Sequence, residues 1–244
     1  MRAIIIGLNS DIGYYLADRY SSIGYEILGT CRIRSKRSDK YGAHLCDVSY
    51  SEEIDEFAAN CLQWDLFISS VGDLKPIGRF FDTDFNQWEQ SVYVNALSQL
   101  YMLYKIYPYR NKSKVVDAVF FAGGGVSRSV VDYSAYTLSK VMLIKMCEIL
   151  NDEYEDINPF IIGPGWVKTK IHQSTTPDAY NYQEVVNFFN SDGGTSMEDI
   201  FEFIEQIRGL RKNIVGGRNF SIYDKLDSSR LKADTNLFKL RRGE

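Results

Sequence analysis

The stretch "AIIIGLNSDIG", residues 3–13, decides the fold. Its first part, residues 3–6, is a short apolar run that predicts a buried strand. Gly7 and Gly13 follow this strand and allow a sharp turn, and Ile12 opens a segment of helical period. A strand that leads through a glycine turn into a helix is typical of a phosphate-binding βαβ unit, because the amides and dipole of the helix N-terminus attract anions.

The rest of the chain repeats this alternation of short apolar runs and longer segments of helical period. Such alternation predicts an α/β protein with a doubly wound parallel β-sheet and helices on both faces. We expect strands at 3–6, 25–31, 43–46, 65–69, 114–122, 158–163 and 219–223. We expect helices at about 12–23, 51–62, 84–106, 134–151 and 196–209.

The chain of 244 residues contains no Pro/Gly/Ser-rich linker, which favours one domain over residues 1–224. Residues 171–195 interrupt the alternation after the sixth expected strand. Because ligands bind beyond the carboxyl ends of strands in open α/β sheets, we expect this segment to be a substrate lid with one short helix. Residues 225–244 form a mildly basic tail, which we expect to dock on the surface through Leu231, Leu237 and Phe238.

Composition is that of an ordinary globular protein, with 45% apolar and 25% charged residues. The formal net charge of -4 disfavours a nucleic-acid partner, because binding many phosphates requires an excess of Lys and Arg. No segment approaches the roughly 18 apolar residues of a membrane span, and the first apolar run is too short for a signal peptide. We therefore expect a cytoplasmic protein with no membrane partner. The cysteines and histidines form no ligand pattern, so no metal site is expected.

The residues after the second expected strand are basic. A chain that prefers NAD usually has an acidic residue there for the ribose hydroxyls, whereas an arginine accommodates the 2′-phosphate of NADP. Arg32 follows Cys31 directly, with Arg34, Lys36 and Arg37 close behind. These residues favour NADP(H), although a solvated basic loop would have the same composition.

Asp47 follows the third expected strand. From this position a carboxylate accepts a hydrogen bond from an adenine amine, or it caps the helix that comes next. The sequence supports the two interpretations equally.

Tyr136 and Lys140 are four residues apart, which puts them on one face of a helix. Tyr101 and Lys105 repeat this spacing deep inside a long helix, where packing explains both residues. Tyr136 instead lies in the first turn of a helix that follows the fifth strand, so it faces the crevice. A phenol that transfers protons near neutral pH needs a pKa well below its usual value of about 10. A cation at ~4 Å in an effective dielectric of about 20 supplies energy of that order, so we expect Lys140, helped by an oxidised nicotinamide, to lower the pKa of Tyr136.

Taken in order, these motifs resemble those of the short-chain dehydrogenase/reductase family. The matching segments are "GLNSDIG" (7–13), Asp47, "SSVG" (69–72), "VNA" (94–96), "YTLSK" (136–140) and "GPGWVKT" (163–169). The resemblance extends over residues 3–223. It implies a Rossmann fold of about seven strands and a nicotinamide cofactor.

The resemblance also implies roles for single residues. Tyr136 would be the acid/base, Lys140 would hold the nicotinamide ribose, and Asn95 would organise a water and Lys140. The implied cofactor-binding residues are Gly7, Asn9, Ser10, Asp11, Ile12, Gly13, Arg32, Asp47, Ser70, Val71, Gly72, Tyr136, Lys140, Pro164, Gly165, Val167 and Thr169.

Three positions depart from the family pattern. Asp11 stands at the middle glycine of the cofactor turn, and "SSVG" lacks the asparagines of the family. Gly123 occupies the position of the catalytic serine, and losing one donor to a developing oxyanion costs about 10²–10³ in rate. The glycine run is explained equally by a simple turn or by close approach of the substrate. The substrate-adjacent replacements are backbone amides or nearby hydroxyls, namely those of Gly123, Gly124, Gly125, Ser127 and Ser134.

These features lead to one hypothesis and two alternatives. The hypothesis is an NADP(H)-dependent oxidoreductase that interconverts a carbonyl and a secondary alcohol on a small polar molecule, with a sugar derivative as one candidate. The first alternative is a catalytically silent NADP(H)-binding regulatory or scaffold protein of the same fold. The second, a nucleotide-sugar epimerase or dehydratase, is disfavoured by the short segment after the sixth strand. The resemblance implies a homodimer or homotetramer, although the residues considered for its interface would serve equally in the core, namely Val92, Leu97, Leu100 and Tyr104.

Overall fold

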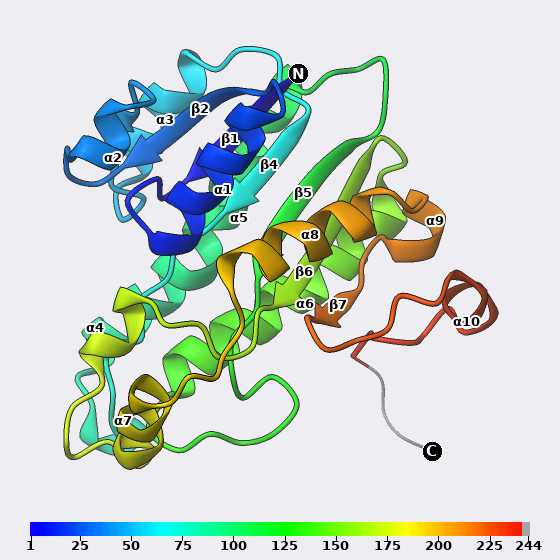
Figure 1. Cartoon of the computed structure of the whole chain (residues 1–244). Coiled ribbons are helices and arrows are strands. Elements are labelled where there is room, and N and C mark those ends of the chain that lie inside the picture. The colour runs from blue at the N-terminus through cyan, green and yellow to red at the C-terminus, as the bar shows by residue number, and fades with distance from the viewer. Residues whose placement is uncertain (241–244) are drawn as a thin grey trace.

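A parallel sheet of seven strands runs through the computed structural model of the chain, which describes residues 1–240 (Figure 1). The strands are β1 (Arg2–Ile6), β2 (Glu26–Cys31), β3 (His44–Leu45), β4 (Leu66–Ser69), β5 (Val116–Phe121), β6 (Ile157–Gly163) and β7 (Asn219–Ser221). Their order is β3-β2-β1-β4-β5-β6-β7, so the order of strands switches direction between β1 and β4. This arrangement confirms the doubly wound parallel sheet.

The helices connect successive strands. They are α1 (Asp11–Ser22), α2 (Lys36–Asp39), α3 (Ser51–Ala59), α4 (Phe85–Val92), α5 (Ser98–Ile106), α6 (Ser134–Glu153), α7 (Tyr182–Asn190), α8 (Met197–Arg208), α9 (Lys212–Val215) and α10 (Ser228–Ala233). The expected helices agree with α1, α3, α4 with α5, α6 and α8 to within a few residues. The short helices α2, α9 and α10 were not predicted, because four to six residues carry too little periodicity to be recognised.

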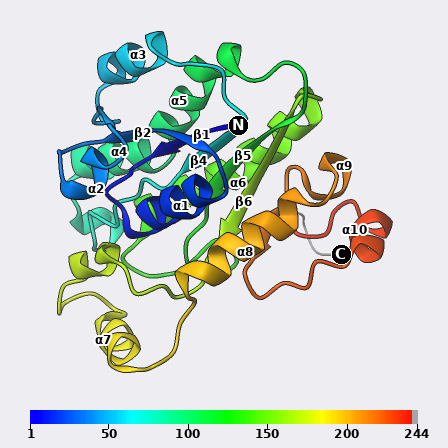
Figure 2. The ribbon, with the colours of Figure 1, turned by 45° about the horizontal axis from the view of Figure 1, so that its top comes forward.

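Alternate side chains of the strands supply two separate cores. Ile5, Ile68 and Phe160 pack with residues of α1 and α8 on one face of the sheet. Ile4 and Phe67 point to the other face, where α3, α5 and α6 cover them. Figure 2 shows α1 and α8 on one side of the strands and α3 and α5 on the other. The strands are therefore buried on both faces, as their nearly continuous apolar sequences require.

The long helix expected at 84–106 is interrupted by a π-helical turn, Tyr93–Leu97, between α4 and α5. The side-chain amide of Asn95 donates to the Ser91 carbonyl at 2.9 Å, the acceptor that the Asn95 backbone would use in an α-helix. The side chain thereby competes with the backbone ladder, and the turn widens. Sequence periodicity does not reveal this exchange of donors.

Two segments lie outside the alternation of strands and helices. The first follows β6, contains a 3-10 helix (Lys170–Ser174) and α7, and lies beyond the carboxyl ends of the strands (Figure 1). The second is the C-terminal segment, which is held by the buried guanidinium of Arg218. This group donates to the carbonyls of Leu231, Asp234 and Leu237 at 2.7, 3.1 and 2.6 Å. Leu231 is buried, and Leu237 packs against the core beside it.

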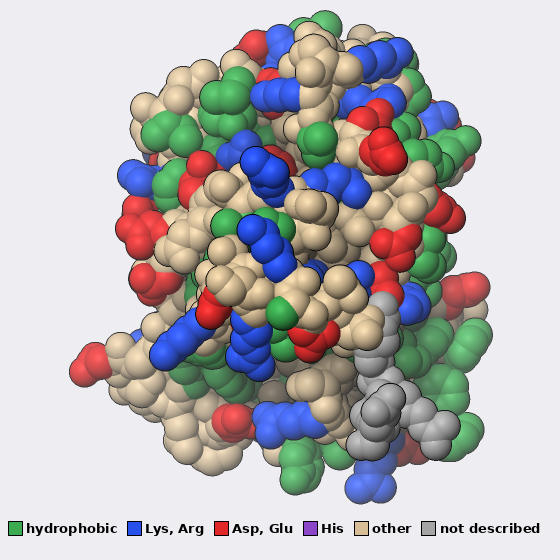
Figure 3. Space-filling view, turned by 90° about the vertical axis from the view of Figure 1, so that its right-hand side faces the viewer, with side chains coloured by type: hydrophobic (Ala, Val, Ile, Leu, Met, Phe, Trp, Pro, Cys, Tyr) green, Lys and Arg blue, Asp and Glu red, His purple; other side chains and the backbone are tan. Residues whose placement is uncertain are grey.

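The face that carries α9, α10 and the C-terminal segment has mixed charge. Figure 3 shows basic and acidic side chains interspersed on it. Mixed charge does not favour binding of a polyanion to this face. Within residues 1–240, no helix has the length and apolarity needed to span a membrane.

Candidate active site

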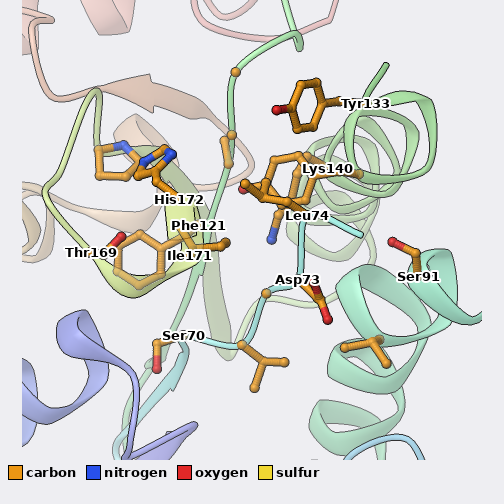
Figure 4. A pocket seen from close by; sticks show the side chains of 18 of the residues that line it. Ser70, Asp73, Leu74, Ser91, Phe121, Tyr133, Lys140, Thr169, Ile171 and His172 are labelled. Atoms are coloured by element: carbon orange, nitrogen blue, oxygen red, sulfur yellow. The ribbon is translucent and has the colours of Figure 1, made fainter. Parts of the chain in front are cut away.

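A crevice with a volume of about 1790 Å³ lies at the carboxyl ends of the strands. Its walls contain every residue predicted to bind the cofactor except Gly13, and also contain Gly123 and Gly124. Figure 4 shows Ser70 on one wall and Thr169, Ile171 and His172 on a second wall. The Lys140 side chain enters from α6 and points its nitrogen into the space between them. The topology thus brings together side chains that are far apart in the sequence.

The glycine turn is shaped by two different constraints. Gly7 has a φ of 88°, a conformation that favours glycine. Gly13 is required by packing, because a Cβ there would lie only 2.5 Å from the Gly7 carbonyl oxygen. Ser10 caps α1 by accepting from the Gly13 amide at 2.8 Å, and its hydroxyl donates to Ser70 at 2.9 Å. These bonds fix the start of α1 against the end of β4, so that the helix N-terminus opens into the crevice.

Asp11 at the middle position of this turn is ion-paired. Its carboxylate lies 2.7 Å from Arg37 and 3.8 Å from the Lys170 ammonium, and it accepts from the Lys170 amide at 3.0 Å. Burial raises the pKa of Asp11, but the hydrogen bonds from Arg37 and Lys170 outweigh it and the net pKa is lowered. The charge that replaces the family's glycine is therefore compensated by two cations, and it joins the segment after β6 to the cofactor turn.

The basic loop after β2 is only partly free. Arg37 is held by Asp11 and lies 5.0 Å from the Tyr14 ring centre, and Arg34 lies 3.8 Å from Asp39. Arg32 is exposed, lines the crevice and makes no ion pair or hydrogen bond to any described residue. Among these arginines, Arg32 alone lines the crevice without a partner in the described residues, and its contact with a phosphate stays a prediction.

Asp47 lines the crevice but does not cap the next helix. Its carboxylate accepts from the Ser49 amide at 2.9 Å, which closes a turn ahead of α3. The helix begins at Ser51, and its N-cap is Tyr50, which makes no side-chain capping bond. The capping interpretation is therefore wrong, and the adenine contact stays a prediction.

Tyr136 and Lys140 lie together in the crevice. The Lys140 nitrogen is 5.4 Å from the centre of the Tyr136 ring, and Lys140 is 2% exposed. No described residue accepts a hydrogen bond from this ammonium or forms an ion pair with it. Burial raises the pKa of Tyr136 to about 12 and lowers the pKa of Lys140 to about 8.

In the chain without a cofactor, Lys140 does not lower the pKa of Tyr136, and its effect together with an oxidised nicotinamide stays a prediction. The ammonium lies beside the phenol ring, and no hydrogen bond joins it to the hydroxyl. Burial penalises the charged forms of both groups, and this effect dominates. Tyr101 and Lys105, which share this spacing, both bond Asp55, at 2.8 and 2.9 Å, and neither lines the crevice.

Asn95 does not line the crevice. Its side chain accepts from the Asp73 amide at 2.9 Å and donates to the Asp73 carbonyl at 2.8 Å. Asn95 therefore fastens the segment after β4, where Asp73 lines the crevice. Its predicted effect on a water and Lys140 stays a prediction.

The glycine run at 123–125 packs against the first turn of α6. A Cβ on Gly123 would lie 2.5 Å from the Tyr136 hydroxyl oxygen, whereas one on Gly124 would meet nothing within 4 Å. Gly125 has a φ of 91°. The run is therefore more than a simple turn, because Gly123 is needed for the close approach of Tyr136.

Two serines were considered as replacements for the missing hydroxyl. Ser127 lines the crevice. Ser134 does not, and its hydroxyl accepts a hydrogen bond from the Trp88 indole at 2.9 Å. Of the two, only Ser127 is placed to meet a ligand in the crevice.

Several crevice residues were missed by sequence reasoning. Tyr133 is buried and donates to Asn181 at 2.8 Å, and Asp132 accepts from the Tyr180 amide at 2.9 Å. These bonds join the start of α6 to the segment 171–195. His172 stacks on Trp166 with ring centres 5.4 Å apart, and burial lowers the pKa of His172. Tyr133 precedes Tyr136 by one turn, and this spacing could have identified it as a crevice residue from the sequence.

No group of three or more His, Cys, Asp or Glu residues within 1–240 could hold a metal ion. The four cysteines of the chain are all buried and free.

Comparison with known proteins finds a family model and relatives that are similar to this chain. A family model described as Enoyl-(Acyl carrier protein) reductase matches residues 7–200. An oxidoreductase of Schizosaccharomyces pombe is 28% identical over 115 residues, which cover 47% of this chain and 46% of that protein. Human dehydrogenase/reductase SDR family member 2, mitochondrial, is 23% identical over 184 residues, covering 68% and 65% respectively. The chain thus spans less than two thirds of the length of these relatives.

Solved structures share the fold at low identity. The KRED1-Pglu enzyme has a TM-score of 0.79 at 20% identity, covering 89% of this chain and 99% of its own. Aldohexose dehydrogenase of Thermoplasma acidophilum has a TM-score of 0.76 at 14% identity, covering 90% and 91%. BdcA, solved in complex with NADPH, has a TM-score of 0.75 at 15% identity, covering 90% and 91%.

The buried ammonium of Lys140 should destabilise the cofactor-free protein. Its pKa falls from 10.5 in the unfolded chain to about 8, so the unfolded state binds more protons between these values. Stability should therefore rise with pH across this window, and the penalty is complete below pH 8. Lys140→Met should raise the unfolding free energy at pH 7 by on the order of 3 kcal/mol and abolish the rise. Urea unfolding at several pH values measures both effects.

Lys105→Met is the matched control. It makes the same substitution on α5, where the ammonium is paired with Asp55 at the surface. This variant should be no more stable than the unmodified chain. A Lys140→Met protein that was less stable at pH 7 would contradict the assignment of an unpaired buried charge.

Proposed function

The chain belongs to the short-chain dehydrogenase/reductase family, and from this premise we propose that it is an NADP(H)-dependent oxidoreductase interconverting a carbonyl and a secondary alcohol. One observation carries the proposal. Tyr136 and the buried, unpaired ammonium of Lys140 share one crevice with the glycine turn that follows β1. Strongly perturbed titratable groups in such a crevice are typical of an active site.

The residues of the crevice fit a nicotinamide dinucleotide. The N-terminus of α1, which opens into the crevice, suits a pyrophosphate, and Lys140 supplies an ammonium that lacks a partner in the described chain. Arg32 would contact the 2′-phosphate. Thr169 and Val167 line the crevice on the side of β6 and would contact the nicotinamide. When bound, the cofactor supplies the hydride.

The protonation states favour proton donation by Tyr136. With a pKa of about 12, the phenol is protonated at neutral pH and carries the proton that a carbonyl oxygen needs when it is reduced. Lys140, with a pKa of about 8, is mostly cationic at pH 7 and would stabilise the phenolate left behind. The pair therefore supports reduction of a carbonyl near neutral pH.

The proposed substrate is a small polar molecule, with a sugar derivative as one candidate. The outer part of the crevice is lined by polar side chains that make no side-chain hydrogen bond to any described residue, namely Asn86, Gln90, Ser127 and Glu184. Segment 171–195 would act as the lid. Its contacts with Asp132 and Tyr133 connect lid closure to the helix that carries Tyr136.

A catalytically silent NADP(H)-binding protein is the second candidate. It is favoured by the lack of a serine at position 123 and by the raised pKa of Tyr136. The variant Tyr136→Phe separates the two functions.

Tyr136→Phe should abolish turnover, because it removes the proton that the carbonyl oxygen receives. The effect on NADPH affinity should be less than about twofold, since the ring is kept. Turnover is measured by nicotinamide absorbance across a panel of carbonyl compounds, and affinity by fluorescence titration.

Tyr101→Phe is the control. Tyr101 has the same four-residue spacing to a lysine but lies outside the crevice, so this variant should retain turnover. Full activity in Tyr136→Phe would remove the mechanism, and the absence of turnover in the unmodified protein on every carbonyl would favour the silent binder.

Arg32→Ala should weaken NADPH binding by about tenfold or more, because a charge-assisted phosphate contact is lost. NADH lacks the 2′-phosphate, so its affinity should change little. Arg34→Ala is the control, since Arg34 lies near Asp39 and does not line the crevice. Equal losses for NADPH and NADH in Arg32→Ala would argue against a phosphate contact.

The protein is also proposed to form a homodimer or homotetramer. Leu97 at the end of the π-helical turn and Tyr104 on α5 are exposed, and so are Leu138, Met142 and Ile149 on α6. These residues are therefore not part of the core, which supports the interface rather than the packing alternative. Val92 and Leu100 are half-buried.

Light scattering should give a mass of at least twice the 28.0 kDa of one chain. Leu97→Asp and Tyr104→Glu should shift the protein toward the monomer, because they place charge in an apolar contact. A monomeric unmodified protein at micromolar concentration would exclude this assembly.

A further inference from the structure

We propose that Gly123 is a positioning residue for Tyr136, and that the phenol occupies the volume a serine side chain would need. The proposal rests on the proposed function, because Gly123 acts through Tyr136 as the acid/base. On this proposal, glycine stands at position 123 because it makes room for Tyr136, and its presence is not merely the loss of a serine. The site would have exchanged a side-chain hydroxyl for a closer approach of the tyrosine to the backbone.

A side chain at position 123 would collide with the ring of Tyr136. A Cβ on Gly123 would lie 2.5 Å from the Tyr136 hydroxyl oxygen and 2.7 Å from Cζ, and closer still to Cε1. Real Cβ contacts essentially never fall below 3.0 Å. The atoms in conflict belong to a rigid ring in the first turn of α6. Any side chain at position 123 therefore displaces the ring or the strand end.

The backbone conformation at Gly123 does not itself require glycine. Gly7 and Gly125 have φ values of 88° and 91°, so conformation alone favours glycine at both positions. Gly123 does not lie in this left-handed region. An L-residue is therefore allowed at position 123 by the backbone and excluded only by the space that Tyr136 fills.

The glycine run at 123–125 lies alongside the first turn of α6. Gly123 faces Tyr136, and a Cβ on Gly125 would lie 2.8 Å from the hydroxyl of Thr137. The Thr137 hydroxyl is itself buried and has no hydrogen-bond partner in the described chain. Gly124 lies between them, lines the crevice and faces open space. Two successive residues of α6 thus pack against alternate glycines.

Gly123 and Gly124 line the crevice beside Tyr136, so their amides are candidates for a second hydrogen-bond donor to a substrate oxygen. The amides of Gly123, Gly124 and Gly125 donate to no described residue. A carbonyl oxygen that accepts from the Tyr136 hydroxyl lies at about 2.7 Å from it and hence close to this run. The amides would replace the serine hydroxyl as the second donor to the developing oxyanion.

Gly123→Ser tests the proposal directly, because the two explanations of the glycine predict opposite changes in kcat. If Gly123 positions Tyr136, the variant should lower kcat by about 100-fold, the cost of a misplacement near 1 Å. Gly123→Ala should lose a similar factor. If the site merely lacks a serine, Gly123→Ser should raise kcat instead, by up to about 10²–10³. A kcat that rises or stays unchanged overturns the proposal.

Two control substitutions accompany these variants. Gly124→Ser meets open space one residue along the run and should retain at least about ten times the kcat of Gly123→Ser. Gly209→Ser lies at the end of α8, outside the crevice, where a Cβ makes only ordinary contacts at 3.4 Å. It should behave like the unmodified protein. NADPH affinity should change less than about twofold in Gly123→Ser, because the collision is with the phenol.

A thermal unfolding cycle gives a readout that does not depend on turnover. Gly123→Ser should lower the Tm of the unmodified protein but not the Tm of Tyr136→Ala, in which the ring is absent. If Gly123→Ser does not fold alone, Tyr136→Ala should restore its folding. An equal fall in Tm in both backgrounds would overturn the proposal.

The two proposals fail in different ways. Full turnover in Tyr136→Phe would remove the proposed function and leave the Tm cycle unaffected. Additive Tm changes together with an inactive Tyr136→Phe would remove the role of Gly123 and leave the proposed function intact.

Discussion

The burial of the Lys140 ammonium without a partner in the described chain is the constraint on which the site depends. A charge in such a place costs stability, and only a well-packed surrounding holds it there. That surrounding is the two-sided core of the sheet, with Leu143, Ile144 and Cys147 anchoring α6 on one face. The energy that the core supplies keeps the ammonium in the crevice.

Two of the three departures from the family pattern are compensated by packing and charge. Asp11 places a carboxylate in a turn that suits a pyrophosphate, and Arg37 and Lys170 neutralise it. Gly123 lacks a hydroxyl, and Tyr136 lies against its backbone instead. In both cases the substituted residue makes a specific contact, so neither position has the character of a degenerate site.

Local patterns in the sequence predicted most of the sheet and the placement of the motifs. The strands are apolar on both faces, and the glycine turn, Asp47 and Tyr136 each follow a strand, so the parallel topology brings them to one edge. The π-helical turn at Asn95 was not predicted, because it depends on a side chain that competes for the Ser91 carbonyl. The contact of Tyr133 with segment 171–195 was also missed, since its partner Asn181 is 48 residues away.

The sequence by itself determined the fold class, the family and the residue types at the mouth of the sheet, because these follow from periodicity and from the order of motifs. The tertiary structure alone decided the charge states and the meaning of Gly123. A pKa depends on burial and on distances between groups, and here burial reversed the expected direction for Tyr136. The absence of a side chain at position 123 becomes informative only when the neighbouring ring is seen to fill the space, since steric exclusion acts between atoms that the chain order does not relate.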